Sequence, residues 1–343
     1  MKKKHIGWII VALPILVFGS CDGDVQGGDG AGPDGDGDTD TDTDADTDTD
    51  SDTDTGTATG PGAGLVGKWG QLVSVTIVQN GIPIVNEQWV ASRNWYLVDL
   101  VTDGEGNLTA HERLCAIRIK LRGMGGANLG NQSIVPQNFV DHIPVLERRV
   151  TVDSEEPGTP WYSDIVYEVR GANLCNGECN PAVDQNCDPL PANGAASGAT
   201  DAPPCDGPCN GQQCDQDQDG LAGMTNSLIG MLNCDVYVTQ RWWARFDGQI
   251  VDENTIAGPI IDNFSEQTVL AASSYTCTLG TPGTASTNCP AHQYFKMVRL
   301  PANATCADVM ALTRCDEDPA HCDSAPGPLT LDPNDDKPTD DCD

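Results

Sequence analysis

Residues 89–121 have the sequence WVASRNWYLVDLVTDGEGNLTAHERLCAIRIKL, and this stretch decides the fold class. Residues 89–101 and 108–121 carry aromatic and branched side chains that alternate with polar ones, as half-buried strands do. Residues 103–107 between them have the sequence DGEGN, and two glycines in so short a segment indicate a hairpin loop. The stretch therefore predicts two antiparallel strands joined by a short connection.

Similar alternation recurs on both sides of this hairpin. It predicts further strands at residues 68–79, 145–152, 162–169, 228–232, 236–246, 268–273 and 293–300. The best helix candidate is residues 306–314, where Thr305 and Asp308 have nearly the spacing of a capping box. The chain is expected to be mainly β, with an antiparallel β-barrel or β-sandwich at residues 64–304. A short helix and an acidic, cysteine-containing tail are expected at 305–343.

A loop-rich, disulfide-rich insertion is expected at residues 173–224. Asn, Gly, Pro and Ala replace the alternating pattern there, together with Cys175, Cys179, Cys187, Cys205, Cys209 and Cys214. The alternative use of these cysteines is metal binding, but the C-x-x-C spacing and nearby histidines of a zinc site are missing from the sequence. Disulfides are therefore favoured. Local bridges are also expected between Cys277 and Cys289, and within the set Cys306, Cys315 and Cys322.

The N-terminus has the features of an export signal. Lysines at positions 2–4 precede a thirteen-residue apolar run at 6–18, too short for a membrane-spanning helix, and Gly19-Ser20-Cys21 follows. These residues resemble the lipobox of bacterial lipoproteins. The resemblance implies a signal peptide at 1–20, lipidation of Cys21 and anchoring to a bacterial membrane, with the outer membrane or cell surface as the expected location. The alternative is ordinary cleavage after Gly19 or Ser20, which would release the protein unlipidated. Lipidation of Cys21 also explains the odd count of fifteen cysteines.

An acidic linker follows Cys21. Every second residue from Asp34 to Asp54 is Asp, so residues 21–63 have little to bury, repel themselves and are expected to form a disordered stalk. Loose collection of calcium by these alternate carboxylates is the other interpretation. The formal net charge of −33 excludes nucleic acid as a partner, because binding a polyanion requires a basic face.

Residues 215–221, DQDQDGL, are the sharpest local motif. Oxygen-bearing side chains at alternate positions and a glycine at the sixth suit a calcium loop. The motif resembles the loops of EF-hands and thrombospondin type-3 repeats. This implies ligation by the side chains of Asp215, Asp217 and Asp219 and by the carbonyl of Leu221. Asn226 stands at position twelve, where an EF-hand has Glu, so an affinity of about 10⁻⁴ to 10⁻³ M is expected. The alternative is a solvated acidic turn.

Trp69 and Arg299 mark the first and last strands expected in the domain. Gly67-Lys68-Trp69 opens the first strand and Arg299 ends the last one, an arrangement that resembles lipocalin-like β-barrels. The resemblance implies that Arg299 packs on Trp69 and that the barrel holds a small apolar ligand. In the alternative, Trp69 is a core residue of another β fold.

The sequence identifies no catalytic residue. Residues 62–67 match G-x-G-x-x-G but follow the acidic linker rather than a strand, and His111 and Glu112 should point to opposite faces of one strand. Trp242 and Trp243 should also face opposite ways, which requires a second packing surface or an exposed Trp. A non-enzymatic structural domain, or one that binds a ligand or an envelope or surface protein, is therefore expected. The alternative is a secreted hydrolase acting on an envelope or extracellular polymer.

Overall fold

The computed structural model describes residues 60–82, 86–103, 107–123, 132–191, 202–229, 233–274, 286–288, 292–313 and 328–329. All of these belong to the compact unit Gly56–Asp343. The predictions for the signal peptide, for Cys21 and for residues 22–59 of the acidic linker fall outside the described residues, as do those for Cys277, Cys289, Cys315 and Cys322. Within the described part of the chain, no helix has the length and apolar character needed to cross a membrane.

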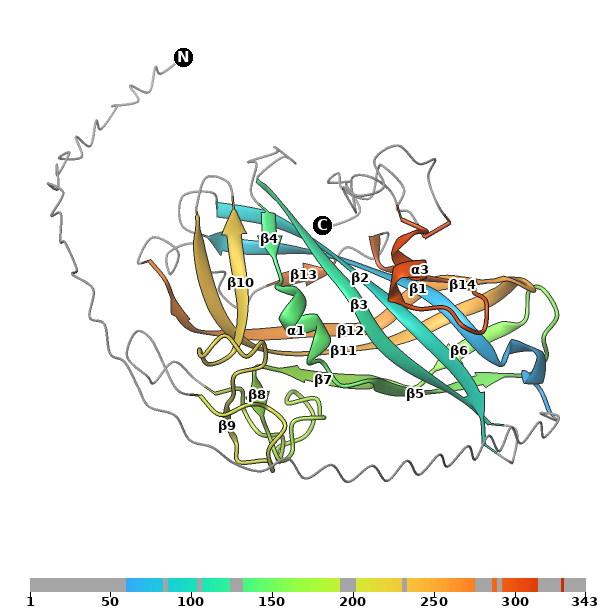
Figure 1. Cartoon of the computed structure of the whole chain (residues 1–343), viewed down its shortest axis with the longest axis horizontal. Helices are drawn as coiled ribbons and strands as arrows, with labels where there is room; N and C mark the ends of the chain where they lie inside the picture. Colours follow the sequence, from blue (N-terminus) through green and yellow to red (C-terminus); the bar gives the residue numbers. More distant parts are fainter. Residues whose placement is uncertain are drawn as a thin grey trace, which may run out of the picture. The chain divides into compact units, whose positions relative to one another are not determined.

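Six antiparallel strands form most of the wall of a barrel (Figure 1). Their order around the wall is β3-β2-β1-β14-β12-β11. Their bounds are Leu108–Gly123 for β3, Asn86–Thr102 for β2, Gly67–Ile82 for β1, Tyr294–Arg299 for β14, Thr255–Ala272 for β12 and Cys234–Asp252 for β11. The β2–β3 hairpin and the pairing of the first strand with the last confirm the expected antiparallel architecture.

The gap between β3 and β11 is bridged in two places. Strands β4 (Gln132–Ile134) and β10 (Met224–Ile229) connect β3 to β11 near one end, and β5 (Leu146–Val152) and β6 (Pro160–Ser163) connect them near the other. Between these bridges, β7 (Val166–Arg170) pairs with β11. Helix α1 (Gln137–Asp141) connects β4 to β5. The strand order thus closes on itself, so the mainly β fold is a barrel rather than two separate sheets.

The remaining elements are short. They are the 3₁₀ helix η1 (Ala63–Leu65), the pair β8 (Ala172–Asn173) and β9 (Gln212–Gln213), strand β13 (Ser286–Asn288), and helix α3 (Cys306–Met310). The predicted helix start is confirmed, because Thr305 and Asp308 form a reciprocal capping box.

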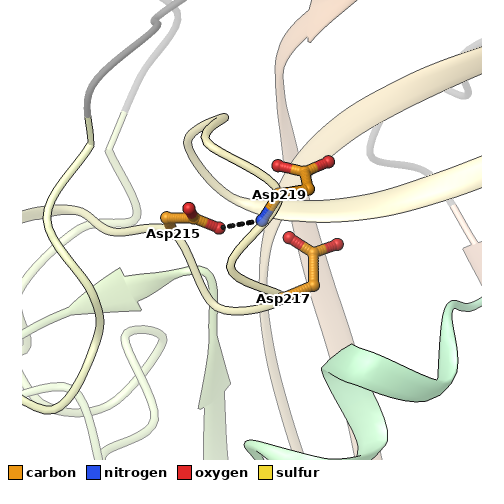
Figure 2. Close-up of side chains that lie close together, drawn as sticks. All are labelled: Asp215, Asp217 and Asp219. Carbon is orange, nitrogen blue, oxygen red and sulfur yellow. Dashed lines mark hydrogen bonds between the residues drawn. The ribbon is translucent and has the colours of Figure 1, made fainter. Parts of the chain in front are cut away.

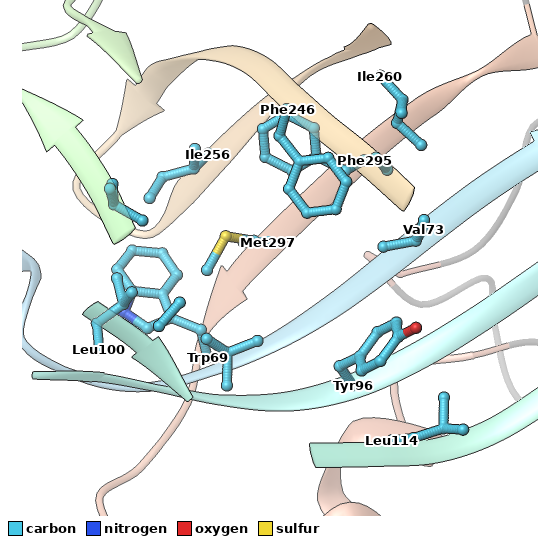
Figure 3. Packing of buried hydrophobic residues seen from close by; sticks show 14 of the residues in the cluster. Trp69, Val73, Tyr96, Leu100, Leu114, Phe246, Ile256, Ile260, Phe295 and Met297 are labelled. Atoms are coloured by element: carbon cyan, nitrogen blue, oxygen red, sulfur yellow. The ribbon is translucent and has the colours of Figure 1, made fainter. Parts of the chain in front are cut away.

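Large apolar side chains pack against one another in the barrel interior (Figure 3). The rings of Phe246 and Phe295 stack with centroids 4.7 Å apart, and Trp161 lies 5.3 Å from Phe295. Gly248 makes room for them, since a Cβ there would lie 2.5 Å from the Phe295 ring. Burial of such aromatic surface is the main source of stability in a core of this kind.

A second apolar cluster lies on the outer face of β1–β3. Leu72, Trp95 and Ala116 are covered there by Val309 of α3 and by Leu329. A disulfide joins Cys115 of β3 to Cys306. The prediction of a local bridge for Cys306 is therefore wrong, because helix α3 packs against the barrel wall and places Cys306 beside a cysteine 191 positions away in sequence.

The cysteine-rich insertion forms a knob on the outer face of β11. Its bridges are Cys175–Cys209, Cys179–Cys187 and Cys205–Cys214, which confirms the predicted disulfide-rich insertion. Arg241 of β11 is fully buried beneath the knob and donates hydrogen bonds to Cys187 Sγ and to the carbonyl oxygen of Asp188.

The two adjacent tryptophans of β11 face opposite ways, as predicted. Trp242 is half-buried and packs against the interior cluster, whereas Trp243 is buried on the outer face with its ring centroid 5.4 Å from that of Tyr167. A second packing surface therefore covers the second tryptophan.

Candidate metal centre

Three carboxylates converge in the segment that leads from the knob into β10. Asp215, Asp217 and Asp219 each offer one oxygen, and these oxygens lie within 4.8 Å of one another (Figure 2). Three oxygens at this separation could hold a metal ion. The structure thus brings together the three side-chain ligands that the sequence predicted.

The backbone winds around Asp215. Its two carboxylate oxygens accept hydrogen bonds from the amides of Asp219 at 3.2 Å and Gly220 at 2.8 Å. Gly220 has φ +88°, a left-handed conformation that glycine adopts without strain. Gln218 is the only non-glycine residue with positive φ among the described residues, at +54°. This turn brings the side chains of Asp215 and Asp219 back towards each other.

Asp217 lies at the bottom of the loop and is 1% exposed. Its Oδ2 accepts a hydrogen bond from the Thr225 amide at 2.8 Å, whereas its Oδ1 is buried and has no hydrogen-bond partner among the described residues. Burial, together with the nearby charge of Asp219, raises the pKa of the Asp217 carboxyl. A buried carboxylate oxygen without a donor is costly, and a cation would compensate for it.

Asp219 is the exposed member of the three. Its Oδ1 accepts from the Leu221 amide at 2.8 Å, and its Oδ2 accepts from Thr225 Oγ1 at 2.8 Å. Thr225 therefore contacts two of the three carboxylates. Thr225 could not be predicted from the sequence, because a calcium-loop pattern specifies ligands rather than the groups that orient them.

Asn226 is placed differently from its three predicted companions. Side chains alternate along β10, so Asn226 shares a face with Met224 and Leu228, which pack in the barrel interior, while Thr225 faces the loop. The Asn226 Oδ1 is buried without a hydrogen-bond partner on that interior side. The ligand role of the Leu221 carbonyl stays a prediction.

The loop is anchored to the barrel through Gln216. Its Oε1 accepts a hydrogen bond from the Gly171 amide at 2.9 Å, and its Nε2 donates to the carbonyl of His142 at the end of α1 at 3.2 Å. The adjacent Cys214 is tied to Cys205 of the knob. The three carboxylates thus lie where the knob, α1 and β10 meet.

The contact predicted between Trp69 and Arg299 is present. The guanidinium carbon of Arg299 lies 4.5 Å from the Trp69 ring centroid, and Trp69 Nε1 donates to the carbonyl of Leu65 at 2.9 Å. Trp69 is fully buried. It is therefore a core residue covered by an arginine. The apolar ligand that the lipocalin resemblance implies stays a prediction.

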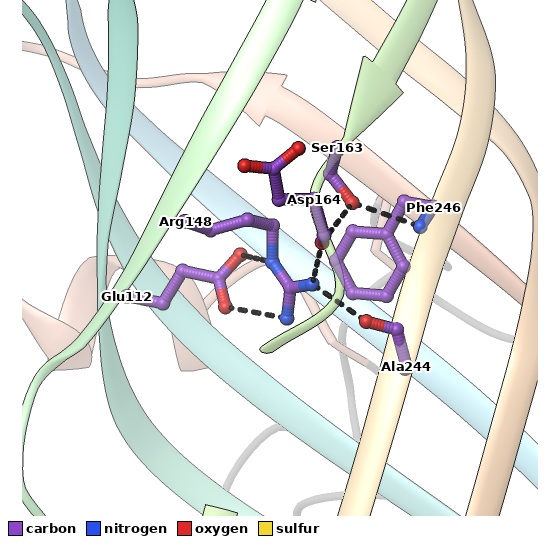
Figure 4. Close-up of polar contacts among 6 residues, drawn as sticks. All are labelled: Glu112, Arg148, Ser163, Asp164, Ala244 and Phe246. Carbon is purple, nitrogen blue, oxygen red and sulfur yellow. Dashed lines mark hydrogen bonds and ion pairs between the residues drawn. The ribbon is translucent and has the colours of Figure 1, made fainter. Parts of the chain in front are cut away.

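A buried ion pair, which the sequence did not reveal, joins the neighbouring strands β3 and β5 inside the barrel (Figure 4). Arg148 donates from Nε and Nη2 to the two carboxylate oxygens of Glu112 at 3.0 and 3.2 Å. Its Nη1 donates to the carbonyls of Asp164 and Ala244, and its guanidinium stacks 4.2 Å from the Phe246 centroid. Every polar group of this pair has a partner, which identifies it as a structural element.

The molecule is thus an antiparallel β-barrel with a three-carboxylate loop at the base of a disulfide-rich knob. No protein-family model, no curated protein and no solved structure matches the chain.

Proposed function

We propose that this chain is an exported, lipid-anchored bacterial surface protein whose barrel is a non-enzymatic binding domain with one calcium ion in the 215–221 loop. The observation that carries the calcium site is the buried Oδ1 of Asp217, which has no hydrogen-bond partner among the described residues and belongs to the three-carboxylate group.

The chemistry of the donor set favours calcium over other divalent ions. All three grouped ligands are carboxylates, and hard oxygen ligands suit calcium and magnesium rather than zinc or copper. Magnesium requires near-ideal octahedral geometry, whereas calcium accepts the irregular oxygen shell of a winding loop. The loop offers few carboxylates, so the expected dissociation constant is about 10⁻⁴ to 10⁻³ M.

Calcium would act here by fixing the knob to the barrel. Gln216 contacts Gly171 on one side and His142 on the other, and Thr225 lies at the start of β10. An ion bound by Asp215, Asp217 and Asp219 would hold these contacts in one arrangement. The knob would then present a fixed surface to an envelope or surface partner.

The location is supported by the N-terminal sequence and by the cysteines. The segment that ends in Gly19-Ser20-Cys21 supplies a lipidation signal. The bridges between cysteines of the described residues require an oxidising compartment to form and persist. Metabolic labelling with a palmitate analogue tests the anchor: we expect label on the full chain and none after Cys21→Ala.

The calcium site is tested by isothermal titration of the full chain, stripped with EGTA, against calcium and then magnesium. We expect one calcium per chain, at least about tenfold weaker binding in Asp217→Asn, and weaker binding of magnesium. Asp206→Asn is the matched control, because Asp206 is an exposed aspartate of the same knob. Absence of a saturable calcium signal, or equal binding by both variants, would reject the site.

No observation on the described residues specifically favours the alternative of a secreted hydrolase. We therefore propose the binding role for this domain.

A further inference from the structure

A group of buried polar side chains lies inside the barrel, separate from the calcium loop. Gln71 of β1, Asn94 and Tyr96 of β2, and Glu168 and Arg170 of β7 are each more than nine-tenths buried. The atoms without a hydrogen-bond partner among the described residues are Gln71 Nε2 and Oε1, Asn94 Oδ1, Tyr96 Oη, Glu168 Oε2 and Arg170 Nη2. Most buried polar groups of native proteins do have partners, so such a concentration requires an explanation.

Strand register places these side chains on the inner face of the wall. Gln71 pairs directly with Tyr96, and Asn94 pairs with Val73, which belongs to the interior cluster. Directly paired residues have Cβ atoms about 5 Å apart, so the Gln71 amide and the Tyr96 ring are neighbours. On β7, Glu168 pairs with Trp242, whose side chain packs against the same cluster.

The charges of Glu168 and Arg170 act on the hydroxyl of Tyr96. The Tyr96 hydroxyl is fully buried, and its pKa is raised first by that burial and next by the charge of Glu168. The charge of Arg170 has the opposite effect and lowers the pKa of Tyr96. Strand register places Tyr96 of β2 and the Glu168–Arg170 pair of β7 on the inner face of the same barrel wall.

The Glu112–Arg148 pair and the Glu168–Arg170 pair differ in how many of their polar groups have hydrogen-bond partners. Arg148 and Glu112 use all their polar groups on each other, on two carbonyls and on an aromatic ring. Arg170 and Glu168 share a single contact, between Nε and Oε1 at 2.5 Å, and Arg170 Nη1 donates to Gln240 Oε1. One acceptor, Glu168 Oε2, and one donor, Arg170 Nη2, are left over. The second pair thus retains the hydrogen-bonding capacity that the first has used.

The chemistry of the available atoms defines what they would bind. The donors are Gln71 Nε2, Arg170 Nη2 and the Tyr96 hydroxyl, and the acceptors are Gln71 Oε1, Asn94 Oδ1 and Glu168 Oε2. The charges of Glu168 and Arg170 cancel, as do those of Glu112 and Arg148. A net-charged guest would therefore introduce an uncompensated buried charge, which is strongly unfavourable.

We propose that the barrel interior binds a small, net-neutral molecule that carries both hydrogen-bond donors and acceptors, such as an amide or a compact polyol, between Gln71, Tyr96 and the Glu168–Arg170 pair. This ligand class differs from the apolar molecule implied by the lipocalin resemblance. The inference does not depend on the calcium loop. A single buried water satisfies about three polar groups, so the six available atoms require either several waters or one larger guest.

Four probes of similar size and different hydrogen-bonding character test the proposal. They are acetamide, which is neutral with donor and acceptor; acetone, which is neutral with an acceptor alone; acetate; and acetamidinium. Each is titrated against the full disulfide-bonded chain by saturation-transfer NMR, once in EGTA and once in calcium. We expect saturable acetamide binding at millimolar concentration and at least about tenfold weaker binding of the other three probes.

Two conservative variants locate the binding. Gln71→Leu and Tyr96→Phe should each weaken acetamide binding by about fivefold or more. Tyr162→Phe is the control for the second variant, because Tyr162 is an exposed tyrosine of β6. Gln71→Leu removes a buried polar group, so it is expected to fold, and its circular dichroism spectrum checks this.

Three results would overturn the proposal: no saturable acetamide binding by the parent chain, acetone binding as well as acetamide, or equal acetamide binding by parent, Gln71→Leu and Tyr96→Phe. The first would leave ordered water as the occupant of the interior. Because the titrations are run with and without calcium, failure of the calcium site alone would leave the acetamide result unchanged.

Discussion

Trp69 and Arg299 are direct partners across the β1–β14 ladder, and the Arg299 guanidinium covers the face of the buried indole at 4.5 Å. The same guanidinium donates to the carbonyls of Gly64, Val66 and Glu253. Arg299 therefore joins the segment before β1, the end of β14 and the β11–β12 turn. A planar cation that both stacks and donates in several directions is required for this role.

Replacement of Arg299 by Lys should destabilise the domain. Lysine retains the charge but lacks the planar group that stacks on Trp69 and the set of donors that reaches three carbonyls. We expect a loss of about 1–3 kcal/mol in the free energy of unfolding, measured by urea denaturation. Arg149→Lys on the exposed face of β5 is the control and should change stability by less than about 0.5 kcal/mol. Equal effects of the two substitutions would contradict the stacking role.

Glu112→Gln should lower the free energy of unfolding far more than the same substitution at an exposed glutamate of the barrel. It leaves the Arg148 guanidinium charged and buried without its carboxylate, and breaking a buried pair in this way costs about 3–5 kcal/mol. Glu147→Gln is the matched control, since Glu147 lies 3.6 Å from His111 at an exposed position of β5. Its effect should stay below about 1 kcal/mol. Chemical denaturation of both variants is the measurement, and a small effect of Glu112→Gln would show that water reaches the pair.

Removal of the Cys115–Cys306 bridge should release the C-terminal segment from the barrel. In the chain-entropy model, a bridge that closes 191 positions contributes up to about 5 kcal/mol. The double Ser variant should lose more stability than the double Ser variant at Cys179 and Cys187, which are only 8 positions apart. Limited proteolysis should also cleave the first variant near α3. An intact C-terminus under these conditions would mean that packing on Trp95 and Leu72 holds the segment without the bridge.

The capping box of α3 should be sensitive to acid. Hydrogen bonds from the Thr305 amide and hydroxyl hold the pKa of the exposed Asp308 carboxyl below its ordinary value. A lowered folded-state pKa stabilises the fold above the ordinary pKa, and this contribution disappears as the pH falls through the lowered value. Asp308→Ala should therefore be less stable than the parent at pH 7 and equal to it at the acidic end of the titration. Thermal unfolding across pH tests this, and a difference that persists in acid would assign the effect to helix propensity.

Where apolar and polar side chains alternate regularly along the sequence, the strands could be predicted. Strands β1, β2 and β3 were predicted within a few residues of their observed bounds, because Trp69, Val73, Tyr96 and Leu114 keep the period of two. The strand predicted at 268–273 extends from Thr255 to Ala272 in the structure. Gly258 and Pro259 interrupt the alternating pattern in the first half of this strand, so the sequence predicted only its end. A Cβ at position 258 would lie 2.3 Å from the Gly248 Cα, so the glycine is required by the close approach of β11 and β12.

The polar interior could not be predicted, because polar residues at alternate positions also suit a solvated face. Glu112 is in phase with Leu108, Ala110 and Leu114, which places it inside the barrel, but the sequence alone does not show that Arg148 lies beside it on the neighbouring strand β5. Asp215, Asp217 and Asp219 could be predicted because their ligands are contiguous. Sites assembled from distant strands leave no such local signature.

The placement of β1 between β2 and β14 has a consequence for synthesis. β2 follows β1 directly, whereas β14 is the last strand of the barrel, so one edge of β1 waits for its partner until residues 294–299 have been made. The Cys115–Cys306 bridge has the same requirement, while the bridges of the knob span at most 34 positions and can close earlier. A chain interrupted before β14 would display an open strand edge, which is a template for aggregation. Synthesis of β14 thus decides whether the strand edge of β1 is covered within the chain or is left open to other incomplete chains.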